Sequence, residues 1–409
     1  MVLNYIWFAF FAIAFVIALC RLVFLNDTTV FPELMNATFE MAKKGFEVSI
    51  GLAGALTLWL GLMRIGEHAG LINVLARAVS PFFRRIFPDI PKDHPALGFI
   101  LLNFSANMLG LDNAASPLGL NAMQSLQELN PKKDTASNSM IMFLVINTAG
   151  LTIIPVSVMA FRAQAGAHNP ADIFIPSIIG TGISALSGLL IVAIWQKLNL
   201  FKPVVYGSIL AFAGALAGML WYFHFLPEEK IATVSAVVSS VVLLSVIMLF
   251  LTAGMIKKVN VYDSFIQGAK DGFVTAVKII PYAVAMLVGI GVFRASGGLG
   301  MITDGIAWLA IHAGLDTAFI PALPTGLMKP FSGPGARGLM IETMKLYGAD
   351  SFAGKAVCVI QGSTDTTFYT IGLYYGSIGV KKIRYTAGAG IIVDMIGIAA
   401  AIWLAYLFF

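Results

Sequence analysis

Long apolar runs dominate the chain, and short polar stretches separate them. A transmembrane helix needs roughly 20 consecutive apolar residues. The runs are too long and too continuous for the alternating strands of a membrane β-barrel. We therefore expect an all-α polytopic membrane protein with about nine crossings. The predicted crossings are residues 3–25, 45–65, 137–162, 172–196, 204–223, 231–256, 272–295, 352–379 and 384–408.

Two further apolar segments, 96–129 and 316–347, are interrupted by polar residues, glycines and prolines. As a helix, the first arm of the earlier segment, 96–111, would be about 24 Å long and would not cross a bilayer. Both segments are therefore predicted to be re-entrant helical hairpins, which enter and leave the membrane on the same side.

The two hairpins contain different helix breakers. Pro117 favours a new helix start in the first hairpin, with Ser116 as its N-cap. In the second hairpin, a cluster of prolines and glycines forbids regular helix. That cluster consists of Pro330, Gly333, Pro334 and Gly335.

Two predicted crossings are also broken, at 145–155 and 361–370, where polar residues gather. A break in a membrane helix must be buried in protein or line a cavity, because lipid cannot satisfy the exposed backbone. Outside the apolar runs, 71–87 alternates apolar and basic residues. That pattern predicts a helix lying on the membrane surface.

The composition supports this class: 58% of residues are hydrophobic and 11% are charged. Soluble domains carry about 25% charged residues. The net charge of +5 does not indicate nucleic-acid binding, because the basic residues stand in short runs between apolar segments. Two cysteines are too few for a disulfide scaffold.

The basic residues predict how the chain is oriented, because lysine and arginine favour the cytoplasmic side. The runs at 77–92, 132–133, 197–202, 257–270 and 381–384 place the N-terminus in the cytoplasm and the C-terminus outside. Four lysines fit this topology less well, because they fall outside. They are Lys43, Lys44, Lys345 and Lys355.

The chain also repeats itself weakly. Each repeat has a helix, an interrupted hairpin, a broken helix and a final helix, and the basic flanks predict opposite orientations. This pattern predicts two inverted-topology repeats, a recurring transporter design with its site near the midplane. The matched pairs are Arg64 with Arg294, Gly70 with Gly300, Gly119 with Gly338, Asn147 with Gln361, and Gly180 with Gly388.

The hairpins and breaks contain the candidate site residues. A charge at the bilayer centre costs at least about 2.5 kcal/mol, which favours a wet cavity or a paired network. The substrate-binding candidates are Asn113, Ser116, Asn147, Thr152, Lys329, Ser332, Arg337, Ser363, Thr364, Asp365 and Thr366. The coupling-ion candidates are Asp112, Glu342, Asp365 and Asp394.

These residues also have structural interpretations. Serine, threonine and asparagine cap helices and join them through hydrogen bonds. Lys329 with Asp365, or Arg337 with Glu342, could form an internal ion pair without a ligand. Asp394 could be a proton or cation group, or a partner for another helix. No metal pattern, cofactor motif or nucleophile–base set is visible, so we expect no metal, no cofactor and no enzyme.

Three strings in these segments resemble a known family. Residues 87–119 (FPDIPKDHPALGFILLNFSANMLGLDNAASPLG) resemble spore maturation protein A. Residues 329–348 (KPFSGPGARGLMIETMKLYG) and 361–379 (QGSTDTTFYTIGLYYGSIG) resemble spore maturation protein B. The chain therefore looks like a fusion of both proteins, within the nucleoside recognition, or Gate, domain group. The resemblance implies an A-like repeat over 1–198, a linking helix over 199–230 and a B-like repeat over 231–409.

Kinship with Gate domains of transporters implies solute passage. We expect a secondary transporter of the bacterial inner membrane for a small polar or anionic solute, coupled to a proton or cation. Nucleoside-like, amino-acid or dipeptide-like and dicarboxylate solutes are the candidate classes. The alternative is a non-transporting scaffold or sensor that recruits a cell-wall or sporulation-type partner. Expected partners are the lipid bilayer, the solute and a second copy of the chain, since twofold assemblies are common.

Overall fold

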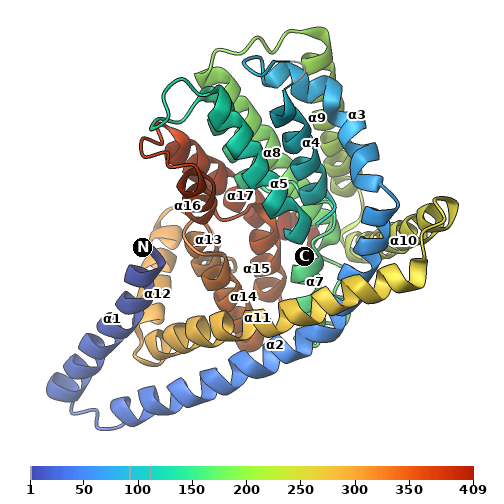
Figure 1. Ribbon diagram of the computed structural model, residues 1–409. Coiled ribbons are helices and arrows are strands. Elements are labelled where there is room, and N and C mark those ends of the chain that lie inside the picture. Colours follow the sequence, from blue (N-terminus) through green and yellow to red (C-terminus); the bar gives the residue numbers. More distant parts are fainter. Residues whose placement is uncertain (1, 92–93, 111, 315) are drawn as a thin grey trace.

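The computed structural model describes residues 2–91, 94–110, 112–314 and 316–409, and every regular element in these ranges is a helix (Figure 1). The first half contains α1 (Val2–Leu25), α2 (Val30–His68), α3 (Leu71–Ile86), α4 (Pro95–Met108), α5 (Asp112–Leu129), α6 (Asn138–Ala149), α7 (Val156–Gln164) and α8 (Phe174–Trp195). The second half contains α9 (Pro203–His224), α10 (Glu228–Ile256), α11 (Val261–Ala295), α12 (Gly298–His312), η1 (Ile320–Ala322), α13 (Leu323–Met328), α14 (Gly333–Tyr347), α15 (Phe352–Ser363), α16 (Thr367–Ser377) and α17 (Thr386–Phe408).

Seven of the described helices, α1, α2, α8, α9, α10, α11 and α17, are long and apolar enough to cross a membrane. The other two predicted crossings are the broken helices α6–α7 and α15–α16. Helices α1, α9 and α10 leave most of their apolar side chains exposed. These surfaces contact lipid in this multi-pass membrane protein.

Helices α2 and α11 are longer than the predicted crossings 45–65 and 272–295. With 39 and 35 residues, they are about 58 and 52 Å long. Charged residues near their N-termini hide these extensions from a hydropathy pattern. The two helices lie side by side along the lower edge of Figure 1. Glycines allow this contact: a Cβ atom on Gly268 would lie 2.2 Å from the carbonyl oxygen of Leu60.

The elements occur in two series of the same order. Helices α2, α3, α4–α5, α6–α7 and α8 are followed by α11, α12, α13–α14, α15–α16 and α17. The offset of 214 residues superimposes Asn138–Ala149 on Phe352–Ser363 at both ends. Before α3 and α12, the left-handed turns fall at Gly70 (φ 79°) and Gly297 (φ 95°). The structural counterpart of Gly70 is therefore Gly297, three residues before the predicted Gly300. The opposite orientation of the two series remains a prediction.

Both hairpins exist, but their helix starts differ from the prediction. Helix α5 begins at Asp112 and contains Pro117, so Ser116 is not its N-cap. A proline in the second turn removes only one bond of the ladder, and α5 packs closely against α4 along its length.

Between its two helices, α13 and α14, the second hairpin is irregular only over 329–332, and Gly333 already begins α14. The prediction of irregular chain at 333–335 was wrong. Pro334 stands in the first turn, where no backbone N–H is needed, and the Ser332 hydroxyl accepts the Gly335 N–H at 3.0 Å. The predicted surface helix 71–87 is confirmed as a helix, α3.

Candidate functional site

The breaks of the two broken helices touch each other. The backbone N–H of Asp365 donates to the carbonyl oxygen of Thr148 at 2.8 Å. Gly150 follows α6 with a φ of 65°, and a Cβ atom there would lie 2.9 Å from the nitrogen of Asp365. Only glycine fits this close approach without displacing the other break.

Each hairpin tip is bonded to one of these breaks. The N–H of Ile153 donates to the carbonyl of Met108 at 2.8 Å, and the N–H of Phe368 donates to the carbonyl of Pro330 at 2.9 Å. The rings of Phe331 and Phe368 also stack, with centroids 5.3 Å apart. Two hairpin tips and two breaks therefore form one continuous set of backbone contacts at the centre of the protein.

On the first-series side, asparagines join α4 to α6. The Asn107 amide donates to the side-chain oxygens of Asn147 at 2.9 Å and Asn103 at 3.4 Å. The Asn103 amide donates to the Ala115 carbonyl at 2.8 Å. Asn147 is thus engaged in helix contacts. Thr152 is half-buried, and its hydroxyl donates to the carbonyl of Gly150 at 3.1 Å.

Three first-series candidates lie on α5. Ser116 is exposed there and makes contacts of its own. The side chains of Asp112 and Asn113 lie outside the described residues.

On the second-series side, most buried candidates also have internal partners. The Lys329 ammonium donates to the Gln361 carbonyl at 2.7 Å. Ser332 caps α14, and the Ser363 hydroxyl donates to the Ile360 carbonyl at 2.8 Å. Glu342 is ion-paired with Arg294, not with Arg337 as one interpretation of the sequence predicted.

Asp394 is fully buried in α17, and one of its carboxylate oxygens accepts the Thr367 hydroxyl at 2.7 Å. Its other oxygen and the hydroxyl of Thr364 are buried, and neither has a hydrogen-bond partner in the described structure. The break at 364–366 therefore places the Thr364 hydroxyl beside the buried carboxylate of Asp394.

Two charged candidates remain accessible. Asp365 is exposed, and its carboxylate accepts the N–H of Thr366 at 2.7 Å. Arg337 is half-buried on α14, and no described carboxylate lies within ion-pair distance of its guanidinium. The first turn of α14 adjoins this break, since a Cβ atom on Gly333 would lie 2.9 Å from the Thr366 hydroxyl. The place where the two breaks touch, which we call the crossing of the breaks, therefore presents an anionic group, a cationic group and a helix N-terminus together.

The sequence did not predict an ionic cluster, buried at Arg162 and exposed at His168, that also joins the two series. Arg162 is fully buried, and its guanidinium lies 2.9 Å from Asp172 and 3.2 Å from Asp350. The ammonium of Lys355 lies 3.1 Å from Asp172, and the His168 ring lies 2.8 Å from Asp350. We call these five residues the Arg162 cluster. A basic residue at the end of the predicted crossing 137–162 was its only local signal.

A second, exposed contact joins the loops before α6 and α17. The Arg384 guanidinium donates to the Ala136 carbonyl at 3.0 Å and to the Asn138 side chain at 2.9 Å. Lys382 lies 3.0 Å from Asp134. The Arg162 guanidinium likewise donates to the Ala349 carbonyl at 2.7 Å. The two contacts correspond to each other. Arg384 of the second series bonds to a carbonyl just before α6, and Arg162 of the first series bonds to a carbonyl just before α15.

Comparison with known proteins agrees with the resemblance seen in the motifs. The model of the nucleoside recognition (Gate) family matches residues 49–165 and 276–381, which contain both hairpins and both breaks. Spore maturation protein A of Bacillus subtilis (strain 168) is 43% identical over 188 residues, covering 46% of this chain and 92% of that protein. Spore maturation protein B of the same organism is 42% identical over 158 residues, covering 38% of this chain and 86% of that protein.

Proposed function

The chain belongs to the nucleoside recognition (Gate) family, and on this basis we propose that it is a secondary transporter for a small polar or anionic solute. Nucleoside-like, amino-acid or dipeptide-like and dicarboxylate solutes are the candidate classes, and a proton or cation is the proposed coupling ion. In this proposal the A-like repeat covers 1–198, a linking helix covers 199–230 and the B-like repeat covers 231–409. No residue is assigned a catalytic role.

The observation that carries the proposal is the hydrogen bond between Asp365 and Thr148, which joins two broken helices from the two series. A broken helix in a membrane costs free energy, because lipid cannot satisfy the exposed backbone groups. Such breaks are characteristic of solute sites in transporters with repeated halves. The N-terminus of α14 carries a partial positive charge, and Arg337 adds a full charge one turn later. These groups would hold an acidic part of the solute, while Asp365 would take an ammonium or the coupling cation.

We also propose a bacterial inner membrane location, with the N-terminus in the cytoplasm and the C-terminus on the opposite side. Contacts between loops support this orientation. Lys382 and Arg384, expected in the cytoplasm, contact the loop that follows Lys132 and Lys133. The Arg162 cluster likewise unites segments that are all expected on the other side. The lysines expected there have carboxylates beside them, with Lys345 as the exception among the described residues.

A non-transporting scaffold or sensor is the second candidate, and one observation favours it. Several polar side chains near the breaks already bond within the protein, as Asn147, Ser332 and Ser363 do. Polar groups of this kind can serve helix packing alone. Such a protein would have the same contact between its two breaks but would transport no solute.

Uptake into proteoliposomes separates the two candidates. We expect uptake of at least one solute from a panel of nucleosides, dipeptides and dicarboxylates. Asp365→Asn and Arg337→Ala should each reduce this uptake by about tenfold or more, which corresponds to the loss of one charge-assisted hydrogen bond. Asp304→Asn on α12 and Lys257→Gln after α10 are matched controls, because both residues are exposed.

Folding must be measured in parallel, by thermal melting of each purified variant. If both site variants melt like the wild type and every flux is unchanged, these residues do not form the site. If the wild type moves no solute on the panel under proton and sodium gradients, the scaffold function is favoured.

A further inference from the structure

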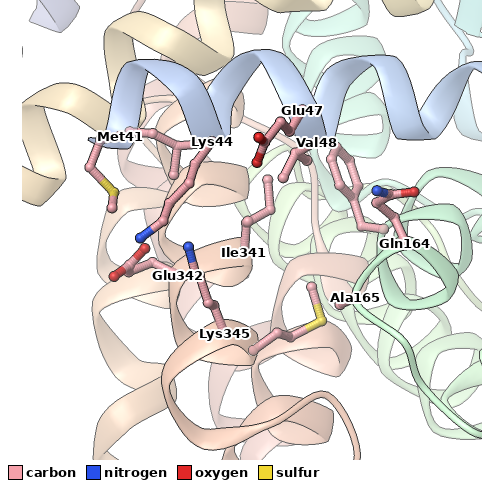
Figure 2. Close-up of a pocket in the computed structure, with 12 residues that line it drawn as sticks. Met41, Lys44, Glu47, Val48, Gln164, Ala165, Ile341, Glu342 and Lys345 are labelled. Atoms are coloured by element: carbon pink, nitrogen blue, oxygen red, sulfur yellow. The ribbon is translucent and has the colours of Figure 1, made fainter. Parts of the chain in front are cut away.

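A cavity of about 230 Å³ lies between α2, α7 and α14, away from the crossing of the breaks (Figure 2). Its lining is divided by chemistry. Apolar side chains, among them Val48, Phe161 and Ile341, cover one part of the wall. Charged side chains, among them Lys44, Glu342 and Lys345, cover another part. A molecule with one charged end and one apolar end would match both parts.

The charged wall contains two lysines, Lys44 and Lys345, and two glutamates, Glu47 and Glu342, and both glutamates have cationic partners from outside the lining. Lys44 is paired with Glu40, and Lys43 lies 3.8 Å from Glu47. The carboxylate of Glu342, whose side chain is 4% exposed, is ion-paired with Arg294. Among the described residues, no carboxylate lies within ion-pair distance of the remaining cation, Lys345.

The two lysines of the cavity converge. Figure 2 shows the ammonium groups of Lys44 and Lys345 pointing toward each other beside Glu342. The two ammonium groups have the same charge and therefore repel one another. This repulsion is stronger beside protein than in bulk water, because the effective dielectric constant is lower there. An oxyanion between them would relieve this repulsion and form charge-assisted hydrogen bonds to both.

We propose that this cavity binds a singly charged oxyanion attached to a short apolar group. The headgroup of the ligand would lie between Lys44 and Lys345, and its apolar part would lie against Val48, Phe161 and Ile341. A free medium-chain carboxylate and an anionic lipid share this chemistry. The lining contains no residue of the breaks at 150–155 and 364–366, so binding here does not depend on the transport function proposed above.

Ligand-induced thermal stabilisation of the purified full chain tests this site, with hexanoate as the probe. A ligand that binds only the folded state raises the melting temperature with its concentration. We expect hexanoate to do so, whereas hexylammonium, with the same tail and the opposite charge, should not. Equal stabilisation by both probes, or by neither, would overturn the proposal.

Variants locate the bound probe. Lys345→Gln should weaken the hexanoate response by about tenfold or more in concentration, as expected for a lost charge-assisted bond. Val48→Trp fills the apolar part and should also weaken the response, which keeps the test valid if one variant folds poorly. Lys345→Arg and the distant Lys257→Gln should retain it. A hexanoate response unchanged in Lys345→Gln would overturn the site.

Reconstitution in lipid nanodiscs distinguishes the two sources of the oxyanion. Phosphatidylcholine nanodiscs with and without phosphatidylglycerol provide the comparison. If phosphatidylglycerol abolishes the hexanoate response of the wild type, an anionic lipid occupies the cavity. If the response persists, the cavity takes a free carboxylate.

Discussion

The backbone N–H of Asp365 bonds to the carbonyl of Thr148 at 2.8 Å, although the two residues come from different series of helices. This bond satisfies one donor and one acceptor that the breaks would otherwise leave open at membrane depth. A buried, unsatisfied backbone group costs about 1–3 kcal/mol. Each break therefore stabilises the other.

Substitution of Gly150 tests this mutual dependence. Gly150→Ala places a Cβ atom 2.9 Å from the nitrogen of Asp365 and requires a left-handed backbone. We expect a loss of about 1–3 kcal/mol in unfolding free energy. Denaturant titration of the detergent-solubilised protein measures it. Gly54→Ala on α2 is the control, because no atom lies within 4 Å of the position that its Cβ would take. Equal stability of the two variants would contradict the close approach.

The Arg162 cluster and the Arg384 contact should differ in energy, although both join the two series. Arg162→Leu removes the buried guanidinium from Asp172 and Asp350, which keep Lys355 and His168 beside them, and should cost about 1.5–3 kcal/mol. Arg384→Leu removes an exposed contact and should cost about 1 kcal/mol or less. Denaturant titration of both variants measures the difference. A larger loss for Arg384→Leu would refute this ranking.

The buried hydrogen bond between Thr367 on α16 and Asp394 on α17 provides a third prediction. Thr367→Val removes the donor to Asp394 and leaves a buried carboxylate with one bond fewer. We expect about 1–3 kcal/mol of destabilisation, measured by denaturant titration. Thr303→Val on α12 is the matched control, because its hydroxyl bonds only to carbonyls of its own helix, those of Leu299 and Gly300. If both variants are equally stable, the bond to Asp394 contributes nothing.

Low pH should reduce the stability that the Arg162 cluster provides, because the carboxylate of Asp350 becomes protonated. Burial acts to raise the pKa of this loop carboxyl, but hydrogen bonds from His168 and the charge of Arg162 outweigh it and hold the pKa below its usual 3.8. A carboxyl whose pKa is lower in the folded than in the unfolded protein stabilises the fold. This stabilisation is fully present above the pKa of the unfolded state and is lost as the pH falls through the pKa of the folded state. This stabilisation should therefore decrease as the pH falls below about 4.

Melting temperatures of the wild type and Asp350→Asn across this pH range provide the measurement. The difference between them should shrink toward acid. Asp304→Asn, an exposed change on α12, should follow the wild type at every pH. A difference between wild type and Asp350→Asn that grows as the pH falls would contradict the sign of this effect.

Local chemistry accounts for what the sequence could predict. Glycine, proline and clustered polar residues mark the hairpins and breaks, and the offset between Asn147 and Gln361 correctly paired the two broken helices. Features that depend on distant contacts were not predictable. Arg162 and Asp350 are 188 residues apart and meet only in the folded chain. The N-cap role of Ser332 likewise depends on where α14 begins, which the sequence did not predict.

The length of helices α2 and α11 makes the protein sensitive to the thickness of the membrane. A rigid pair roughly twice as long as the hydrocarbon layer cannot stand upright in it and must lean or extend into water. A thicker membrane lets the pair stand more steeply, and a thinner one makes it lean further. Because α14 packs against α11, a change in the tilt of this pair would be transmitted to the hairpin α13–α14, whose tip contacts the break of α15–α16.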